Sequence, residues 1–420
     1  MKKLAIITSH PIQYYAPWFR HLASTTDFSI KVFYLWDFGV NQQVDVDFQH
    51  PIQWDIPLLT GYEYEFVANV SSNPGTHHFW GLQNPSLLER VSIYKPDAVL
   101  LMSYNYASLY DFLWRWNHRQ VPLLFRGDSH RLLPSTGAKE WARRKFISLI
   151  YRRFSACLYV GKANYGYFLD HGVPPQSLFF APHAVDNDRF KAHTESANCK
   201  AMLWKQELLI PKNHSVILFA GKFELKKRPL DLLQAFLQAN LPQVSLLFVG
   251  AGAQMRELRS KAAEHPHIHF APFQNQTLMP RTYATADLVV LPSYGSEETW
   301  GLAINEAMCM SRPVIASSHV GCVPDLIQPY RNGLIFPAGD VSALAASLKE
   351  AFSNRERLQM WGEESQKIVT NYSYTQMTQG LREALKSLSV LDSSVGVRSQ
   401  ESGVRSQELR EKPGLPSILF

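Results

Sequence analysis

The sequence predicts an α/β protein built from two doubly wound parallel-sheet domains that face one another across a cleft. Short apolar runs alternate with helix-length segments, and they do so in two successive series along the chain. Of the 420 residues, 46% are hydrophobic and 19% are charged, which supplies enough apolar side chain for two sizeable cores. Uninterrupted apolar runs of this length are typical of parallel strands buried on both faces.

The elements follow in order along each half. In the first half, strands are predicted at residues 4–8, 30–34, 98–102, 123–126 and 156–160, with helices over 16–23 and 87–94. In the second half, strands are predicted at residues 216–220, 245–249, 267–270, 288–291 and 314–316, with helices over 230–239, 254–264 and 304–310. Because carboxyl ends of parallel strands open on the ligand crevice, side chains that follow these strands are the candidates for a site.

Changes in composition along the chain predict its domain boundaries. We expect a first domain over residues 1–190, a polar linker at 186–213 and a second domain over 191–371. A further helix is predicted over 374–388, within the segment 372–390. In the tail, 391–420, the unit Gly-Val-Arg-Ser-Gln-Glu at 396–401 recurs at 403–408, and such a polar repeat predicts disorder.

Charge and cysteine content narrow the classes of partner. The 42 Lys and Arg against 36 Asp and Glu permit an anionic partner, but no nucleic-acid-binding module accompanies them. The four cysteines lack disulfide-framework or zinc spacing, and the apolar start of the chain is too short for a signal peptide. With no long apolar run either, we expect a cytoplasmic protein with reduced thiols and no nucleic-acid partner.

A basic loop follows the first strand of the second half. The strand at 216–220 runs into Gly221, and Lys222 and Lys227 lie among the cations that come next. Lysines at such a strand end can hold phosphate oxygens. On this stretch alone, a solvated basic turn is the favoured interpretation.

Two carboxylates flank a helix start farther along. Glu298 lies in a small-residue loop after the strand at 288–291, and Glu306 follows eight positions later on the predicted helix. Backbone N–H groups of Trp300, Gly301 and Leu302 at that helix start suit an anion or sugar oxygens. A first-turn Glu and an unrelated surface Glu would give the same spacing, so both interpretations stay open.

Taken together, these motifs resemble the signature of glycosyltransferase family 4. The resemblance rests on Gly221-Lys222 with Lys227, residues 249–252, 283–287, Glu298 with Glu306, 312–316, 321–327 and 332–334, in that order. It covers about residues 180–345 densely. Lys222 stands where many relatives have Arg, and the loop before the first carboxylate is longer than usual, so Glu297 is an alternative to Glu298.

The resemblance implies a GT-B fold, with a C-terminal helix crossing back to the first domain, and a retaining glycosyltransferase that uses a nucleotide-diphosphate sugar without a metal or cofactor. Lys222, Lys227 and the backbone around Gly221 and Trp300–Leu302 would hold the diphosphate. Glu306 would bind the ribose and Glu298 the donor sugar. The acceptor would be a sugar or lipid-linked sugar in bacterial polysaccharide or glycolipid synthesis. A GT-B sugar-nucleotide epimerase and a non-catalytic scaffold are the alternatives.

In the first half the match is looser. His10 and Gln13 follow the first strand, where relatives carry a glycine-rich loop, and they are candidates for contact with the acceptor or diphosphate. Asp128 follows the strand at 123–126, where relatives place a catalytic-site His, and His130 comes two residues later. An ordinary helix start at residue 11 and a turn Asp at 128 are the structural interpretations.

The segment 115–153 holds ten Lys or Arg. Arg144, Lys145, Ser148 and Arg152 share one helical stripe, with Phe146, Leu149 and Ile150 opposite. This pattern predicts either peripheral contact with an anionic membrane or a solvated helix face over a packed core. Two motifs that suggest metal binding, Asp45-Val46-Asp47 and the His residues of 265–269, lack a suitable setting, so no metal site is predicted.

Overall fold

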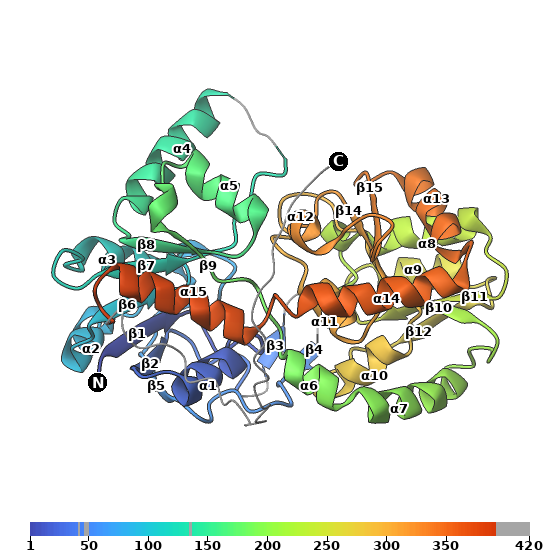
Figure 1. Cartoon of the computed structure of the whole chain (residues 1–420), viewed down its shortest axis with the longest axis horizontal. Coiled ribbons are helices and arrows are strands. Elements are labelled where there is room, and N and C mark those ends of the chain that lie inside the picture. The colour runs from blue at the N-terminus through green and yellow to red at the C-terminus, as the bar shows by residue number, and fades with distance from the viewer. Residues whose placement is uncertain (41–42, 46–49, 134–136, 392–420) are drawn as a thin grey trace, which may run out of the picture.

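The molecule, seen in a computed structural model that describes residues 1–40, 43–45, 50–133 and 137–391, contains two domains, each built on a parallel sheet (Figure 1). The first sheet has the order β5-β2-β1-β6-β7-β8-β9, and the second has the order β12-β11-β10-β13-β14-β15. Every pairing in these two sheets is parallel. The predicted α/β class with two doubly wound sheets is confirmed.

The strands of the first sheet are β1 (Lys3–Thr8), β2 (Ser29–Tyr34), β5 (Glu63–Phe66), β6 (Ala98–Leu101), β7 (Leu123–Arg126), β8 (Ala156–Tyr159) and β9 (Leu178–Phe180). Those of the second are β10 (Ser215–Ala220), β11 (Val244–Val249), β12 (Ile268–Ala271), β13 (Leu288–Leu291), β14 (Val314–Ser317) and β15 (Gly333–Phe336). A separate antiparallel pair joins β3 (Gln43–Asp45) to β4 (His50–Ile52). The edge strands β5, β9 and β15 are absent from the sequence prediction. β9 has only three residues, and β5 is exposed at three of its four positions, so neither forms a buried apolar run.

Helices cover both faces of each sheet (Figure 1). Those of the first domain are α1 (Ala16–Thr25), α2 (Leu87–Tyr94), α3 (Ala107–Arg115), α4 (Ala138–Tyr151) and α5 (Lys162–Asp170). Next come α6 (Asn187–Ala192), α7 (Thr194–Glu207), α8 (Pro229–Ala239), α9 (Met255–Ala262), α10 (Met279–Ala284), α11 (Leu302–Cys309), α12 (Val323–Leu326), α13 (Val341–Phe352), α14 (Arg355–Val369) and α15 (Tyr374–Ser387). Short 3-10 turns are η1 (Phe79–Gly81), η2 (Pro175–Ser177), η3 (Leu225–Lys227) and η4 (Gln276–Leu278).

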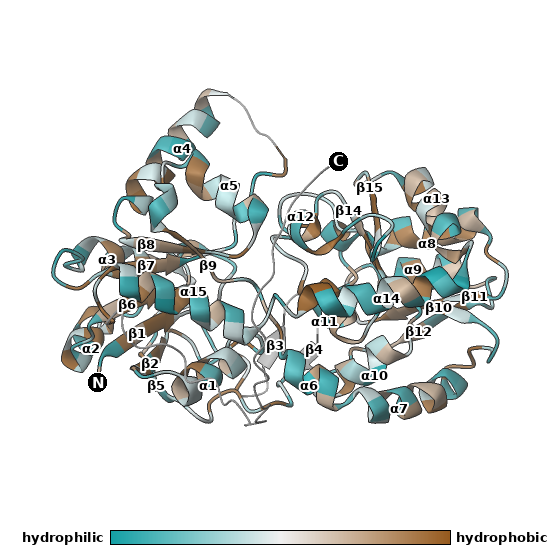
Figure 2. Ribbon diagram, in the orientation of Figure 1, coloured by the Kyte–Doolittle hydropathy of each residue, from teal (hydrophilic) through white to brown (hydrophobic). Residues whose placement is uncertain are grey.

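Burial on both faces explains the apolar strands, which form the hydrophobic centre of each domain in Figure 2. Alternate residues of β1 serve two cores: Ala5 and Ile7 pack on one side of the sheet, and Leu4 and Ile6 pack on the other. A strand covered by helices on both faces therefore carries few polar residues before it ends, and the buried Ser245 of β11 is one of these few. Most polar groups of the site accordingly follow the strand ends.

The predicted linker at 186–213 is wrong, because most of it forms α6 and α7. Asp186 caps α6 by accepting a hydrogen bond from the Arg189 backbone N–H at 3.0 Å. Phe190 and Trp204 are buried in a core of the second domain. The segment is polar overall because these helices bury only a few side chains, namely Phe190 of α6 and Ala197, Ala201 and Trp204 of α7.

The helix α15 lies against the first domain although it follows the second in sequence (Figure 1). Its buried Met377 and Leu381 join a core of the first domain, and the Trp18 indole N–H donates to the Thr378 hydroxyl at 3.2 Å. Over residues 1–391, as far as the structure describes them, the chain thus crosses between the domains twice. The predicted disordered tail lies outside the described residues, apart from Leu391. Within the described ranges, no helix combines the length and apolar character required to cross a bilayer.

Candidate active site

A cavity of about 400 Å³ lies between the two domains, at the carboxyl ends of both sheets. The first domain lines it with Gln13 and Tyr14 after β1, Asp128 after β7 and His183 after β9. The second domain contributes the residues that follow β10, β11, β12 and β13. Residues far apart in sequence therefore meet because parallel strands all end at the same edge of a sheet.

The basic loop after β10 forms one wall, with Gly221, Lys222, Lys226 and Lys227. The loop is held against the turn after β11 by close backbone packing. A Cβ atom on Gly250, which has a φ of +145°, would lie only 2.0 Å from the Gly221 carbonyl oxygen. Only glycine allows this approach, so the turn at 249–252 brings the loop to the cavity edge.

Glu298 faces the basic loop from the opposite wall. Its carboxylate forms an ion pair with the Lys227 ammonium and accepts a hydrogen bond from the Ser293 hydroxyl at 2.8 Å. The residue is only 9% exposed. The alternative carboxylate, Glu297, is 72% exposed at its side chain and lies 3.8 Å from the Lys226 ammonium. The geometry therefore favours Glu298 as the carboxylate of the inner wall.

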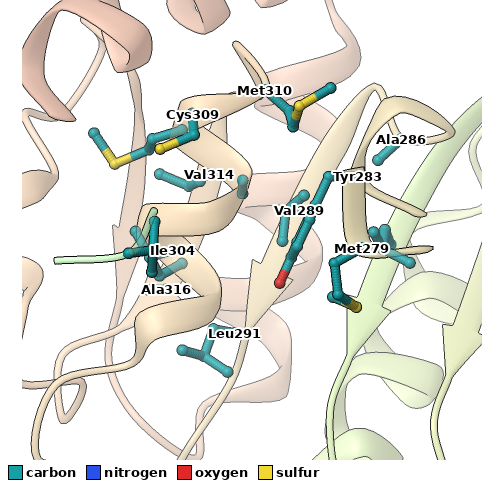
Figure 3. Packing of buried hydrophobic residues seen from close by; sticks show 14 of the residues in the cluster. Met279, Tyr283, Ala286, Val289, Leu291, Ile304, Cys309, Met310, Val314 and Ala316 are labelled. Atoms are coloured by element: carbon teal, nitrogen blue, oxygen red, sulfur yellow. The ribbon is translucent and has the colours of Figure 1, made fainter. Parts of the chain in front are cut away.

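Glu306 is buried on the first turns of α11, which begins just after Gly301. Its Oε2 atom accepts a hydrogen bond from the Tyr283 hydroxyl at 2.7 Å, and Figure 3 shows the Tyr283 ring lying between Val289 and Met279. Burial raises the pKa of the Glu306 carboxyl. Burial and the Glu306 charge also raise the pKa of Tyr14, which approaches from the first domain.

Trp300 and Gly301 shape the start of α11. Gly301 has a φ of +94°, which favours glycine, and the indole N–H of the buried Trp300 donates to the Asn305 side chain at 2.8 Å. Together with Leu302 they line the cavity, so backbone groups at the helix start face the space between Lys227 and Glu306.

Asp128 links the two domains. Its Oδ2 atom lies 3.2 Å from His183 Nε2 and accepts a hydrogen bond from the Thr299 hydroxyl at 2.8 Å. Burial raises the pKa of Asp128, but the hydrogen bond and charge of His183, the Thr299 hydroxyl and the Arg126 charge outweigh it and hold the pKa well below its usual range. Asp128 is therefore an ionised carboxylate at the cavity wall.

His183 is a site residue that the sequence analysis missed. It is 4% exposed, and its ring lies 5.5 Å from the Trp300 ring. His183 could have been found from its position three residues after β9, because residues that follow strands line the cavity. However, β9 has only three residues, and periodicity does not reveal so short a strand.

Of the remaining candidate residues in the first half, one lines the cavity and two lie away from its open space. Gln13 lines the cavity, whereas His10 packs edge-on against Trp36 and Phe38, with ring centroids 5.9 and 5.5 Å away. His130 is buried, and its Nε2 atom lies 3.4 Å from the Glu298 carbonyl oxygen. His130 thus supports the loop that carries Glu298 rather than facing the open space.

Direct contacts hold the domains together around the cavity. Asp55 accepts hydrogen bonds from the backbone and hydroxyl groups of Thr277, and the Asn275 side chain donates to the Gln53 carbonyl at 2.7 Å. Trp54, between these residues of the first domain, lines the cavity, and its ring lies 6.3 Å from that of Phe273. The arrangement encloses a cavity with carboxylates on two sides and cations on a third.

Comparison with known proteins agrees with this geometry. Residues 202–368 match the sequence model of the family described as "Glycosyl transferases group 1". Among curated proteins, the chain is similar to the sulfoquinovosyl transferase SQD2 of Arabidopsis thaliana, with 27% identity over 201 residues, 47% of this chain and 38% of that protein. It is also similar to the D-inositol 3-phosphate glycosyltransferase of Xylanimonas cellulosilytica, with 30% identity over 42% of this chain and 43% of that protein. The chain thus spans less than half the length of either relative.

Among solved structures, the Anabaena protein Alr3699/HepE in complex with UDP superposes with a TM-score of 0.70 at 18% identity, over 92% of this chain and 100% of that one. The protein has the GT-B fold. The similarity to trehalose 6-phosphate synthase of Burkholderia multivorans, with a TM-score of 0.68 at 13% identity over 93% of this chain and 99% of that one, supports the same fold. At these identities the similarity concerns fold alone, whereas the family match covers the domain that carries Lys227, Glu298 and Glu306.

Proposed function

We propose that this protein is a retaining glycosyltransferase of family 4 that transfers a sugar from a nucleotide-diphosphate sugar to a hydroxyl group. The observation that carries the proposal is the convergence of Lys222, Lys227, Glu298 and Glu306 on one cavity between the domains. The group 1 family match over 202–368 supports it, as does the binding of UDP and UDP-glucose by the structurally similar HepE protein.

The donor's leaving group needs positive charge. Cleavage of the sugar–phosphate bond leaves negative charge on the diphosphate, and preorganised cations stabilise it as it develops. Lys222 and Lys227 supply these cations, and the backbone at the start of α11, from Trp300 to Leu302, adds the positive end of a helix. In the protein without donor, Lys227 is paired with Glu298, so the incoming diphosphate replaces Glu298 as its partner.

The two carboxylates hold the donor's hydroxyl groups. Glu306 lies deep beside Tyr283 and binds the ribose hydroxyls, and its Oε1 atom has no hydrogen-bond partner in the part of the chain that the structure describes. Glu298 lies nearer the cavity mouth and binds the donor sugar once Lys227 turns to the diphosphate. With the ribose at Glu306 and the sugar at Glu298, the nucleoside lies deep in the cavity. The reacting carbon of the sugar then faces the first domain.

Asp128 faces that carbon from the first domain. As an ionised carboxylate it stabilises the positive charge that develops on the sugar ring, and it orients the acceptor hydroxyl. His183 and Thr299 hold the carboxylate in this position from both domains. A donor phosphate oxygen takes the acceptor's proton on the same face of the sugar, which gives retention, and no metal or cofactor takes part.

The experiment is nucleotide release from a panel of UDP-, GDP- and ADP-sugars in the presence of EDTA. Sugars and lipid-linked sugars of bacterial surface polysaccharides and glycolipids serve as acceptors. One donor class should turn over, and NMR of the product should show the donor's anomeric configuration. A wild-type protein that neither binds nor turns over any of these donors would refute the proposal, and an inverted product would refute its stereochemistry.

A further inference from the structure

Three large apolar side chains of α4 are about half exposed or more. Trp141 is 64% exposed, Phe146 is 50% exposed and Leu149 is 48% exposed, whereas Ile147 and Ile150 on the inner face are buried. The sequence interpretation of a solvated face over a packed core is therefore wrong for Phe146 and Leu149. An amphipathic helix normally buries such residues, so their exposure needs a physical reason.

The exposed side chains continue onto neighbouring elements. The Phe146 ring stacks on Tyr110 of α3 with centroids 6.3 Å apart, and Tyr110 in turn lies 5.9 Å from Phe79 and 6.3 Å from Trp114. Phe79 and Trp114 are each 40% exposed, and Trp80, next to Phe79, is 62% exposed. We call these residues, with Trp141 and Leu149, the aromatic surface of the first domain.

Cations are interspersed with the aromatic surface. A surface groove beside α4 is lined by Trp141, Arg144, Lys145, Leu149 and Arg152, and also by Asp170 of α5, which lies 3.9 Å from the Arg144 guanidinium. The Lys145 ammonium lies 5.9 Å from the Trp141 ring centroid. The single acidic residue of α4, Glu140, is turned inward with a side chain only 15% exposed and is paired with two arginines. The outward charge of this helix is therefore positive.

We propose that α4 and the aromatic surface dock on an anionic bilayer. Aromatic rings favour the headgroup level of a membrane, where one end of the side chain is apolar and the other is wet. Lys145 and Arg152 would face acidic headgroups, each adding to the affinity as a charge near the surface. The helix α4 projects from the body of the first domain in Figure 1, so a flat surface can reach it. This inference does not rest on the proposed transfer reaction.

The test is sedimentation of the full chain, without donor, with vesicles of phosphatidylcholine alone or mixed with phosphatidylglycerol. Wild-type protein should sediment with the mixed vesicles and much less with the neutral ones. Lys145→Gln/Arg152→Gln should weaken the binding roughly 25-fold, from two charges at about 5-fold each. The matched control, Lys212→Gln/Arg256→Gln, removes the same charge from exposed positions of the second domain and should bind as the wild type does.

A second variant tests the aromatic contribution. Trp141→Ser/Phe146→Ser should bind more weakly than the wild type at high salt, where charge attraction is screened. Circular dichroism should show an unchanged fold, because both side chains are exposed. No wild-type binding to mixed vesicles, equal losses for the α4 charge pair and its control, or tighter binding to DNA than to vesicles would overturn the inference. None of these outcomes bears on donor turnover.

Discussion

The ion pair between Lys227 and Glu298 predicts a measurable cost when one partner is removed. The two side chains are only 20% and 11% exposed, so Lys227→Ala leaves a carboxylate that is largely shielded from water, with Ser293 as its other hydrogen-bond partner. Breaking a fully buried pair costs about 3–5 kcal/mol of unfolding free energy. Since this pair borders the cavity and keeps some access to water, we expect about 2 kcal/mol.

The assay is urea unfolding followed by fluorescence. With an m-value of about 2 kcal/mol per M for a domain of this size, Lys227→Ala should lower the midpoint of the second domain's transition by about 1 M. Lys227→Ala/Glu298→Gln should regain at least half of that loss, because the neutral amide no longer needs a cation. The m-value should stay constant throughout.

Lys226→Ala is the matched control. Its ammonium lies 3.5 Å from Glu224 and 3.8 Å from Glu297, but Lys226 is 36% exposed and Glu297 is 72% exposed at the side chain. Exposed pairs of this kind contribute about 0–1 kcal/mol, so the midpoint should move by about 0.5 M or less. If both single variants shift the midpoint equally, or if Glu298→Gln fails to rescue Lys227→Ala, the pair does not carry the energy assigned to it here.

Three further predictions concern activity and pH. Glu306→Gln should raise the KM for the donor about 10-fold or more. In the wild type, that KM should rise as the pH falls. Burial raises the pKa of Glu306, so its carboxylate is protonated at a higher pH than an exposed glutamate. Asp128→Asn should lower kcat on the order of 100-fold, while Asp111→Asn on the exposed face of α3 leaves it unchanged; equal kcat values would remove Asp128 from the mechanism. Burial and the Arg126 charge lower the pKa of His183 below the usual 6.5, so the unfolded chain binds its proton more readily and stability falls as the pH drops below about 6.5. His183→Gln should lose less stability than the wild type between about pH 7.5 and pH 5.5, measured by urea midpoints.

Some of the site was predictable because its signals are local. The basic loop follows β10 directly, and Glu298 and Glu306 flank one helix start, so each motif lies within a short stretch of sequence. Parallel strands then bring these stretches together, since their carboxyl ends share one edge of the sheet. The strand ends made Lys227 and Glu306 candidates for a cleft, and only the resemblance to glycosyltransferase family 4 assigned both to one donor site.

Other features depend on contacts between distant residues. Lys227 and Glu298 are 71 positions apart, and their pairing is decided by how two loops face each other across the cavity. His183 reaches Asp128 only because β9 lies at the edge of the first sheet, beside β8 and near the second domain. The periodicity of apolar residues does not predict which of these distant side chains come into contact.

The sequence by itself therefore determined the two parallel-sheet domains and the chemistry at the strand ends. Strands buried on both faces need long apolar runs, so most polar groups follow the ends of the strands. Only the tertiary structure decided which of those groups meet and which surfaces stay uncovered. Periodicity identifies the apolar residues of a helix, but it does not show whether another element covers them. Phe146 and Leu149 on α4 are exposed for that reason, while Phe190 and Trp204, in a stretch that looked like a linker, are buried.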